Sequence, residues 1–188
     1  MKATIWGRLL TLLERLHHDP TLIRGHGSGF EIEFARQLQR HGIFPSKRVG
    51  YERHPNGPHK WPDFHLYDER TLIPIELKTT GRKPVHMGQT WIVSEAIYVI
   101  SHHSSKTRMD QTPQHSIFMA WGKDMKTEED DHKYRDYRYA MKEFQNKYDQ
   151  RIFSSSVEWS TQMELRYRLE ERDHERLYRR VMEDLRRL

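Results

Sequence analysis

The sequence predicts an α/β fold in which helices flank a central sheet of about five strands. Apolar residues recur at helical spacing near both ends of the chain, and short apolar runs of strand length lie between them. Of the 188 residues, 31% are charged and 35% are hydrophobic, yet 11% are aromatic, which disfavours a disordered chain. We therefore expect one domain over residues 1–188.

The first part of the chain is predicted to form two helices. Residues 4–17 have apolar positions at helical spacing, and the glycine-rich segment 25–29 ends this helix. Ser28 is expected to be the N-cap of a second helix that ends at His41 and Gly42. Its apolar face carries Phe30, Phe34 and Leu38.

Five strands are expected between the helical parts, separated by a loop over residues 53–62 that contains three prolines. Pro74 cannot donate to a strand ladder, so it is expected at a strand start or at a locally unpaired position. The last two runs are continuously apolar, which predicts burial on both faces. The expected strands are 47–51, 63–67, 72–78, 96–100 and 117–121.

A helical extension is predicted over about residues 127–188. Thr127 to Asp130 resembles a capping box and should open a helix that runs to about residue 148. Residues 152–153 are a candidate edge strand, and 161–188 should form a mixed-charge surface helix. Its apolar stripe either packs on the core or forms a dimer seam; the stripe comprises Leu177, Tyr178, Val181, Met182, Leu185 and Leu188.

Composition excludes several classes of chemistry. The chain has no cysteine, which excludes disulfides, thiolate zinc sites and cysteine nucleophiles. The adjacent pairs among its 13 histidines lack the i, i+4 spacing of a helical zinc site, so a structural zinc is disfavoured. No apolar stretch reaches the roughly 20 residues of a membrane span, and the N-terminus turns charged too early for a signal peptide. We expect a cytoplasmic protein without a membrane partner.

Charge is distributed unevenly along the chain, whose formal net charge is +5. The acidic segment 63–76 lies between two segments, 41–62 and 77–108, in which basic residues outnumber acidic ones. This order suits a site that binds a metal ion and a phosphate backbone together. Simple variation of charge along a hydrophilic sequence is the alternative.

Asp63, Glu76 and Lys78 are the strongest candidates for chemistry. Glu76 and Lys78 project from the same face of one strand, and a hairpin through the 68–71 turn can bring Asp63 beside Glu76. Two carboxylates suit Mg²⁺, with the carbonyl of Leu77 as a further ligand. Lys78 can orient or help deprotonate a metal-bound water, or stabilise charge on a phosphate. These groups suit phosphodiester hydrolysis; a surface salt bridge is the structural alternative.

The pattern Pro62-Asp63…Glu76-Leu77-Lys78 resembles the signature of the PD-(D/E)xK nuclease superfamily, which has the restriction-endonuclease-like fold. The segment 27–38 resembles the helix that carries an upstream metal-site glutamate in Holliday-junction resolvases and many restriction enzymes. This resemblance implies Glu31 as that acid, with Glu33 as the second choice on the opposite side of the helix. A glutamate favoured by the helix dipole is the alternative for Glu31.

The resemblance covers about residues 27–121 and implies a mixed sheet whose second and third strands bear the Asp and the ExK motif. It further implies a nuclease domain that cleaves double-stranded DNA with Mg²⁺ and leaves a 5′-phosphate. A type II restriction endonuclease is favoured, and a palindromic target implies a homodimer. A junction resolvase, a phage or repair nuclease and a non-catalytic DNA-binding module are the alternatives.

DNA contacts are expected in the flanking basic segments. Backbone contacts are assigned to Lys47, Arg48, Lys60, Arg82 and Lys83. Base contacts are assigned to a predicted loop over residues 101–114, at His102, His103, Lys106, Arg108 and Gln111. Trp91 and Tyr98 either stack on bases or belong to the core, and the core is the favoured interpretation.

Overall fold

The computed structural model describes residues 4–23, 27–58, 60–81, 85–88, 91–103, 115–147, 165–167 and 171–188. Its helices are α1 (Ile5–His18), α2 (Ser28–Arg40), α3 (Glu128–Lys147) and α4 (Glu171–Arg186), with the 3-10 helices η1 (Pro20–Leu22) and η2 (Gly122–Asp124). Its strands are β1 (Gly50–Arg53), β2 (Phe64–Tyr67), β3 (Leu72–Thr80), β4 (Val85–Gly88), β5 (Ile97–His103), β6 (His115–Trp121) and β7 (Leu165–Tyr167).

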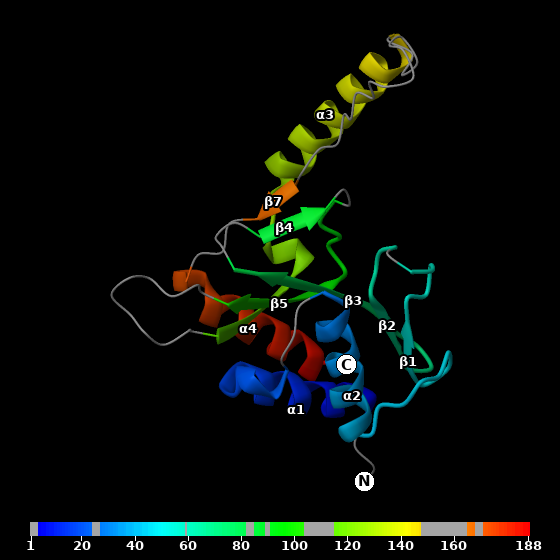
Figure 1. The fold of residues 1–188 in the computed structure, drawn as a ribbon, viewed down its shortest axis with the longest axis vertical. Helices are drawn as coiled ribbons and strands as arrows, with labels where there is room; N and C mark the ends of the chain where they lie inside the picture. The colour runs from blue at the N-terminus through cyan, green and yellow to red at the C-terminus, as the bar shows by residue number, and fades with distance from the viewer. Residues whose placement is uncertain are drawn as a thin grey trace.

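A mixed five-stranded sheet forms the centre of the molecule, in the order β1-β2-β3-β5-β6. Only β3 and β5 pair in parallel; the other neighbours are antiparallel. Helices α1, α2 and α4 lie together on one side of this sheet (Figure 1). These features confirm the predicted α/β class with a helix-flanked sheet and a C-terminal helix.

The core has a layer on each face of the sheet. Buried residues of α1, α2 and α4 pack with one face, which includes Leu77 and Val99. The opposite face, which includes Tyr98 and Ile100, packs with residues of β4 and with Leu177. The apolar run of β5 is therefore buried on both faces, as predicted, and Tyr98 is a core residue.

The stripe on α4 is part of this core. Its residues from Leu177 to Leu185 are buried, whereas Leu188 is 53% exposed. Helix α4 contacts β6 and α1. The stripe therefore packs on the protein's own core and does not present a free dimer seam.

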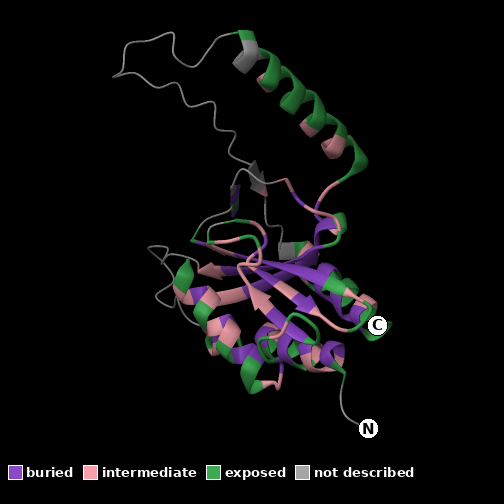
Figure 2. Cartoon of the chain, turned by 90° about the vertical axis from the view of Figure 1, so that its right-hand side faces the viewer, coloured by how far each residue is buried: buried purple, intermediate pink, exposed green. Residues whose placement is uncertain are grey.

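Helix α3 projects away from the body of the molecule, and most of its described side chains are exposed (Figures 1 and 2). Its start is anchored: Thr127 and Asp130 exchange the hydrogen bonds of the predicted capping box. Trp91 stacks on Tyr134, with ring centroids 4.3 Å apart, and donates to Asp131. Trp91 therefore holds α3 to the body.

Several local predictions were wrong. Strand β1 starts at Gly50 rather than residue 47, and Gly27 rather than Ser28 is the N-cap of α2, without a side-chain cap. The last helix starts only at residue 171, because residues 165–167 form β7 and pair with β4. The candidate edge strand 152–153 lies outside the described residues.

Pro74 lies inside β3, opposite His65 of β2. The pairing of β3 with β5 begins only at Ile75. The missing N–H of proline is therefore tolerated at a position where the strand has a neighbour on one side only, in agreement with the predicted locally unpaired position. None of the described helices has the length and apolar character that crossing a bilayer requires.

The start of β1 depends on a glycine. Gly50 has a φ of +150°, and a Cβ built on it would lie 2.1 Å from the carbonyl oxygen of Phe44. We expect Gly50→Ala to lower the free energy of unfolding by about 2–4 kcal/mol, because this backbone oxygen must move. Urea denaturation measures the change. The control is Gly29→Ala, whose Cβ would meet no atom within 4 Å; equal midpoints for the two variants would contradict this account of Gly50.

Candidate functional site

Asp63 and Glu76 lie at a fork between two strands. The pairing of β2 with β3 ends at Phe64 and Ile75, and from Ile75 onward β3 pairs with β5. The two carboxylates therefore flank the point where β2 and β3 separate. The Leu77 amide donates to Asp63 Oδ2 at 2.8 Å. The Asp63 side chain therefore connects β2 to β3 beyond the end of their backbone pairing. The predicted approach of Asp63 to Glu76 is present.

Glu76 and Lys78 form a buried pair. Lys78 Nζ lies 2.5 Å from Glu76 Oε1, and the Glu76 side chain is only 7% exposed. The other oxygen, Oε2, is buried without a hydrogen-bond partner among the described residues. A buried carboxylate oxygen without a donor is costly, and it is an available ligand for a cation. The pair is therefore not the surface salt bridge considered above.

Burial controls the charge of both acids. It raises the pKa of Asp63 against the lowering effect of the Leu77 amide and Lys78, and the charge of Glu31 raises it further. Burial likewise raises the pKa of Glu76, opposed mainly by the charge of Lys78, while the charge of Asp63 raises it. The two ionised carboxylates are thus destabilised by burial and by like charges, and a bound cation would relieve both.

Glu31 reaches the same site from the first turn of α2. Its Oε2 accepts from Arg53 Nη2 at 2.9 Å and lies 3.0 Å from His54 Nε2. One ligand atom each from Glu31, His54 and Asp63 lies within 4.8 Å of the others. Glu31 is therefore beside Asp63, as the family resemblance implied.

Glu33, the second choice, lies elsewhere. It contacts Arg36 at 3.1 Å and Gln37 at 3.3 Å on its own helix. The two glutamates therefore differ in surroundings, and only Glu31 belongs to the cluster. Glu31 also stands in the first turn of α2, so the helix dipole favours its charge in addition.

His54 was not predicted as a site residue. It follows β1 directly, in a segment that the sequence assigned to a loop, and it is one of 13 histidines without a distinguishing spacing. Its φ of 50° is unusual for a residue with a side chain. The His54 amide donates to the Asp63 carbonyl at 2.8 Å, which fixes this conformation beside the acid.

The donor set fits a divalent cation. Glu31, His54 and Asp63 form one cluster. Glu76, on whose pKa the charge of Asp63 acts, adds a carboxylate with one unsatisfied oxygen. Leu77 was predicted to supply a carbonyl ligand. The contact that the structure gives for its backbone is the hydrogen bond from its amide, which holds Asp63 in place. The arrangement can hold a metal ion next to the ammonium group of Lys78.

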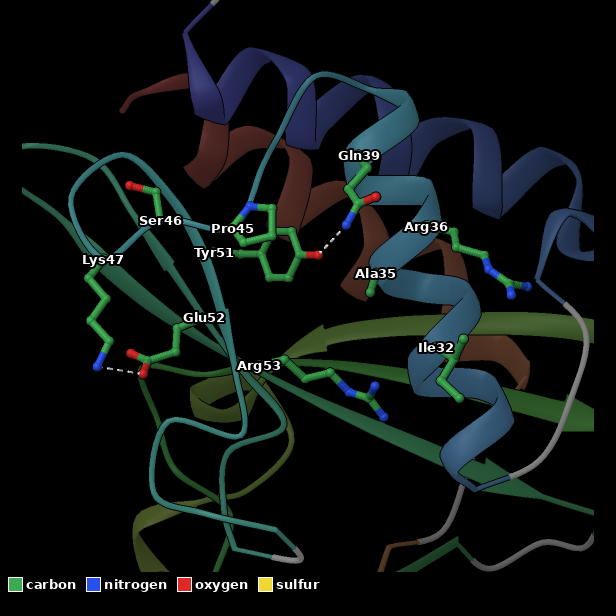
Figure 3. Close-up of a pocket in the computed structure, with 10 residues that line it drawn as sticks. All are labelled: Ile32, Ala35, Arg36, Gln39, Pro45, Ser46, Lys47, Tyr51, Glu52 and Arg53. Atoms are coloured by element: carbon green, nitrogen blue, oxygen red, sulfur yellow. Dashed lines mark hydrogen bonds and ion pairs between the residues drawn. The ribbon is translucent and has the colours of Figure 1, made fainter.

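A cavity of about 490 Å³ lies between α2 and residues 45–53, and Arg53 is one of its lining residues (Figure 3). Its walls include Ile32, Ala35 and Pro45, and its charged lining residues are Arg36, Lys47, Glu52 and Arg53. Figure 3 shows Arg53 extending from β1 toward α2, on which Glu31 lies. A cavity lined by basic and apolar side chains therefore lies next to the carboxylate site.

The predicted DNA contacts have mixed positions. Lys47, Arg48 and Lys60 are exposed, and Lys47 forms a 2.9 Å ion pair with Glu52. His102 and His103 belong to β5, so their assignment to a loop was wrong; His103 stacks on His115. The remaining candidates lie outside the described residues: Arg82, Lys83, Lys106, Arg108 and Gln111.

Comparisons of the chain with protein-family models, with curated proteins and with solved structures found no match. The fold and the site geometry are therefore the basis for a functional proposal.

The pH dependence of the free energy of unfolding should show how much ionised Asp63 and Glu76 destabilise the folded state. Their folded-state pKa values are raised, so the folded chain binds protons more tightly than the unfolded chain. Stability should then fall as pH rises from about 4 through the raised pKa. Asp63→Asn keeps an acceptor for Leu77 but removes this charge, and in EDTA its melting temperature should exceed the wild type by a few degrees at pH 7.

This gain should disappear below pH 4, where the wild-type carboxyls are protonated. Asp131 is the control, because its hydrogen bond from Lys126 lowers the pKa of that carboxyl. Asp131→Asn should therefore lower the melting temperature at pH 7. Thermal scans from pH 3 to 8 test both signs; a loss of stability at pH 7 in Asp63→Asn would contradict the assignment of Asp63 as a destabilised acid.

Proposed function

We propose that this protein is a Mg²⁺-dependent endonuclease that hydrolyses phosphodiester bonds of double-stranded DNA. The observation that carries the proposal is the convergence of Asp63, Glu76 and Lys78 at the fork of β2 and β3. Glu31 joins them from α2. The resemblance to PD-(D/E)xK nucleases supports the same assignment, since these positions match the four motif residues. A non-catalytic module would not need the whole set.

Each residue has a role in this hydrolysis. Asp63 and Glu76 would hold the ion through their carboxylates, and Glu31 would support it from α2. When bound, Mg²⁺ stabilises negative charge on the phosphate and makes water more acidic. Lys78 orients the attacking water and stabilises charge on the phosphate. Water attacks phosphorus and gives up a proton to solvent. The bond from phosphorus to the 3′ oxygen breaks, and this oxygen takes up a proton and leaves as a 3′-hydroxyl. A 5′-phosphate remains on the other strand end.

The basic side chains around the cavity supply a surface for the DNA backbone. Arg36, Lys47 and Arg53 line the cavity, and Arg48, which follows Lys47 in sequence, is exposed. We propose a sequence-specific enzyme of the type II restriction class. A palindromic target then requires a two-fold dimer, whose interface must differ from the buried stripe of α4. A junction resolvase or a phage or repair nuclease is the second candidate.

Cleavage of supercoiled plasmid tests the proposal directly. The wild type should nick or cut the plasmid with Mg²⁺ and be inert in EDTA. Asp63→Ala and Lys78→Ala should each lose at least about 100-fold in cleavage rate, since each removes a group proposed to stabilise the transition state. Glu33→Ala is the matched control, because Glu33 is an acid of the same helix outside the cluster.

The pattern of products separates the alternatives. Discrete bands from a mapped phage DNA support the restriction class, and cleavage of branched DNA alone supports a resolvase. Wild-type protein that binds DNA but does not cut it with any divalent ion would indicate a binding module. Full activity in Asp63→Ala or Lys78→Ala would refute the site assignment.

Charge reversal at Lys47 tests the DNA surface. The side chain of Lys47 is 81% exposed, and its ammonium group lies 2.9 Å from Glu52 Oε1. If Lys47 contacts a phosphate, Lys47→Glu should weaken DNA binding at least fivefold at low salt and reduce the salt slope by about one. Fluorescence anisotropy in EDTA measures both. Lys133→Glu on α3 is the control and should bind DNA like the wild type.

A further inference from the structure

We propose that the site binds a first-row transition-metal ion of the Mn²⁺ type in preference to Mg²⁺, with His54 as a direct ligand beside Glu31 and Asp63. This inference deepens the proposed function, on which its catalytic meaning rests, by changing the identity of the ion. The binding itself is measured without DNA and stands or falls independently.

The spacing of the ligand atoms supports one shared ion. Ligand atoms of Glu31, His54 and Asp63 lie within 4.8 Å of one another. Two ligands at about 2.1 Å from an ion are about 3 Å apart at right angles and about 4.2 Å apart when opposite. His54 Nε2 and Glu31 Oε2 form an ion pair at 3.0 Å, so the imidazole and the carboxylate already lie side by side. A contraction of roughly half an ångström would therefore close the cluster on an ion.

The surroundings of His54 also point to a ligand. Only one ring nitrogen of His54 is engaged among the described residues: Nε2 lies 3.0 Å from Glu31 Oε2, and Nδ1 is buried without a partner. Its positive φ is a cost that the fold maintains beside the carboxylates. Arg53 occupies only Oε2 of Glu31, which leaves the other oxygen for an ion.

The ligand types determine which ion is preferred. Mg²⁺ favours oxygen ligands and gives up its water reluctantly, whereas an imidazole nitrogen favours first-row transition ions. Two carboxylates, of Glu31 and Asp63, beside one imidazole keep the site hard enough for Mn²⁺. Glu76, buried and with one unsatisfied oxygen, is the third carboxylate at the fork.

Calorimetric titration of the full chain with MnCl₂ and with MgCl₂ tests the preference, and pulsed electron paramagnetic resonance of bound Mn²⁺ detects nitrogen coordination. The wild type should bind Mn²⁺ at least tenfold more tightly than Mg²⁺ and show coupling to one imidazole nitrogen. His54→Asn retains a residue that tolerates positive φ. It should lose this coupling and at least tenfold in Mn²⁺ affinity, while Mg²⁺ affinity changes less than threefold.

His65→Asn is the matched control, because His65 is a partly buried histidine whose ring contacts Tyr67 instead of the cluster. It should retain both the coupling and the metal preference. Bound Mn²⁺ without nitrogen coupling in the wild type, or an unchanged ratio of affinities in His54→Asn, would overturn the inference and leave His54 as a partner of Glu31. Should His54→Asn fold poorly, the coupling in the wild type decides alone.

Cleavage assays then separate the two proposals. Cutting with Mg²⁺ by a protein that shows no nitrogen coupling supports the nuclease and refutes the His54 ligand. Nitrogen-coordinated Mn²⁺ without cleavage of DNA in either ion supports the ligand and refutes the nuclease.

Discussion

The hydrogen bond from the Leu77 amide to Asp63 Oδ2 is the interaction on which the site depends. Where β2 ends, the backbone of β3 loses its neighbour on that side, and a polar group left without a partner there would be costly. The carboxylate of Asp63 supplies the acceptor. Glu76 is the residue before Leu77 on β3, so the same hydrogen bond holds the Asp63 carboxylate close enough for its charge to act on Glu76. The hydrogen bond that satisfies the Leu77 amide thus also fixes the position of the Asp63 carboxylate.

The sequence contained enough information for the sheet and for the acids at its fork. Alternation along β3 is local, so it places Glu76 and Lys78 on one face without knowledge of the tertiary structure. The apolar pattern that predicts α2 is also local in sequence. The choice of Glu31 over Glu33, however, came from a family resemblance. The structure supplied the contact with His54 and Arg53 that distinguishes the two glutamates.

Other features have no local signal. His54 becomes a site residue through its positive φ and through the docking of β1 beside α2, and neither leaves a pattern in the sequence. Strand β7 is three residues long and pairs with β4, which is distant in sequence, so helical periodicity dominated that prediction. Trp91 likewise found its partner on α3 only through tertiary packing.

The fork has a consequence for the order of folding. Asp63, Glu76 and Lys78 lie directly beyond the open end of the β2–β3 hairpin, whose short loop costs little chain entropy to close. Glu31 belongs to α2, which precedes the hairpin in sequence and reaches β3 only through tertiary contacts. A partly unfolded chain that has released α2 would keep the hairpin acids together and lose Glu31. The complete cluster therefore requires α2 to be packed against the sheet.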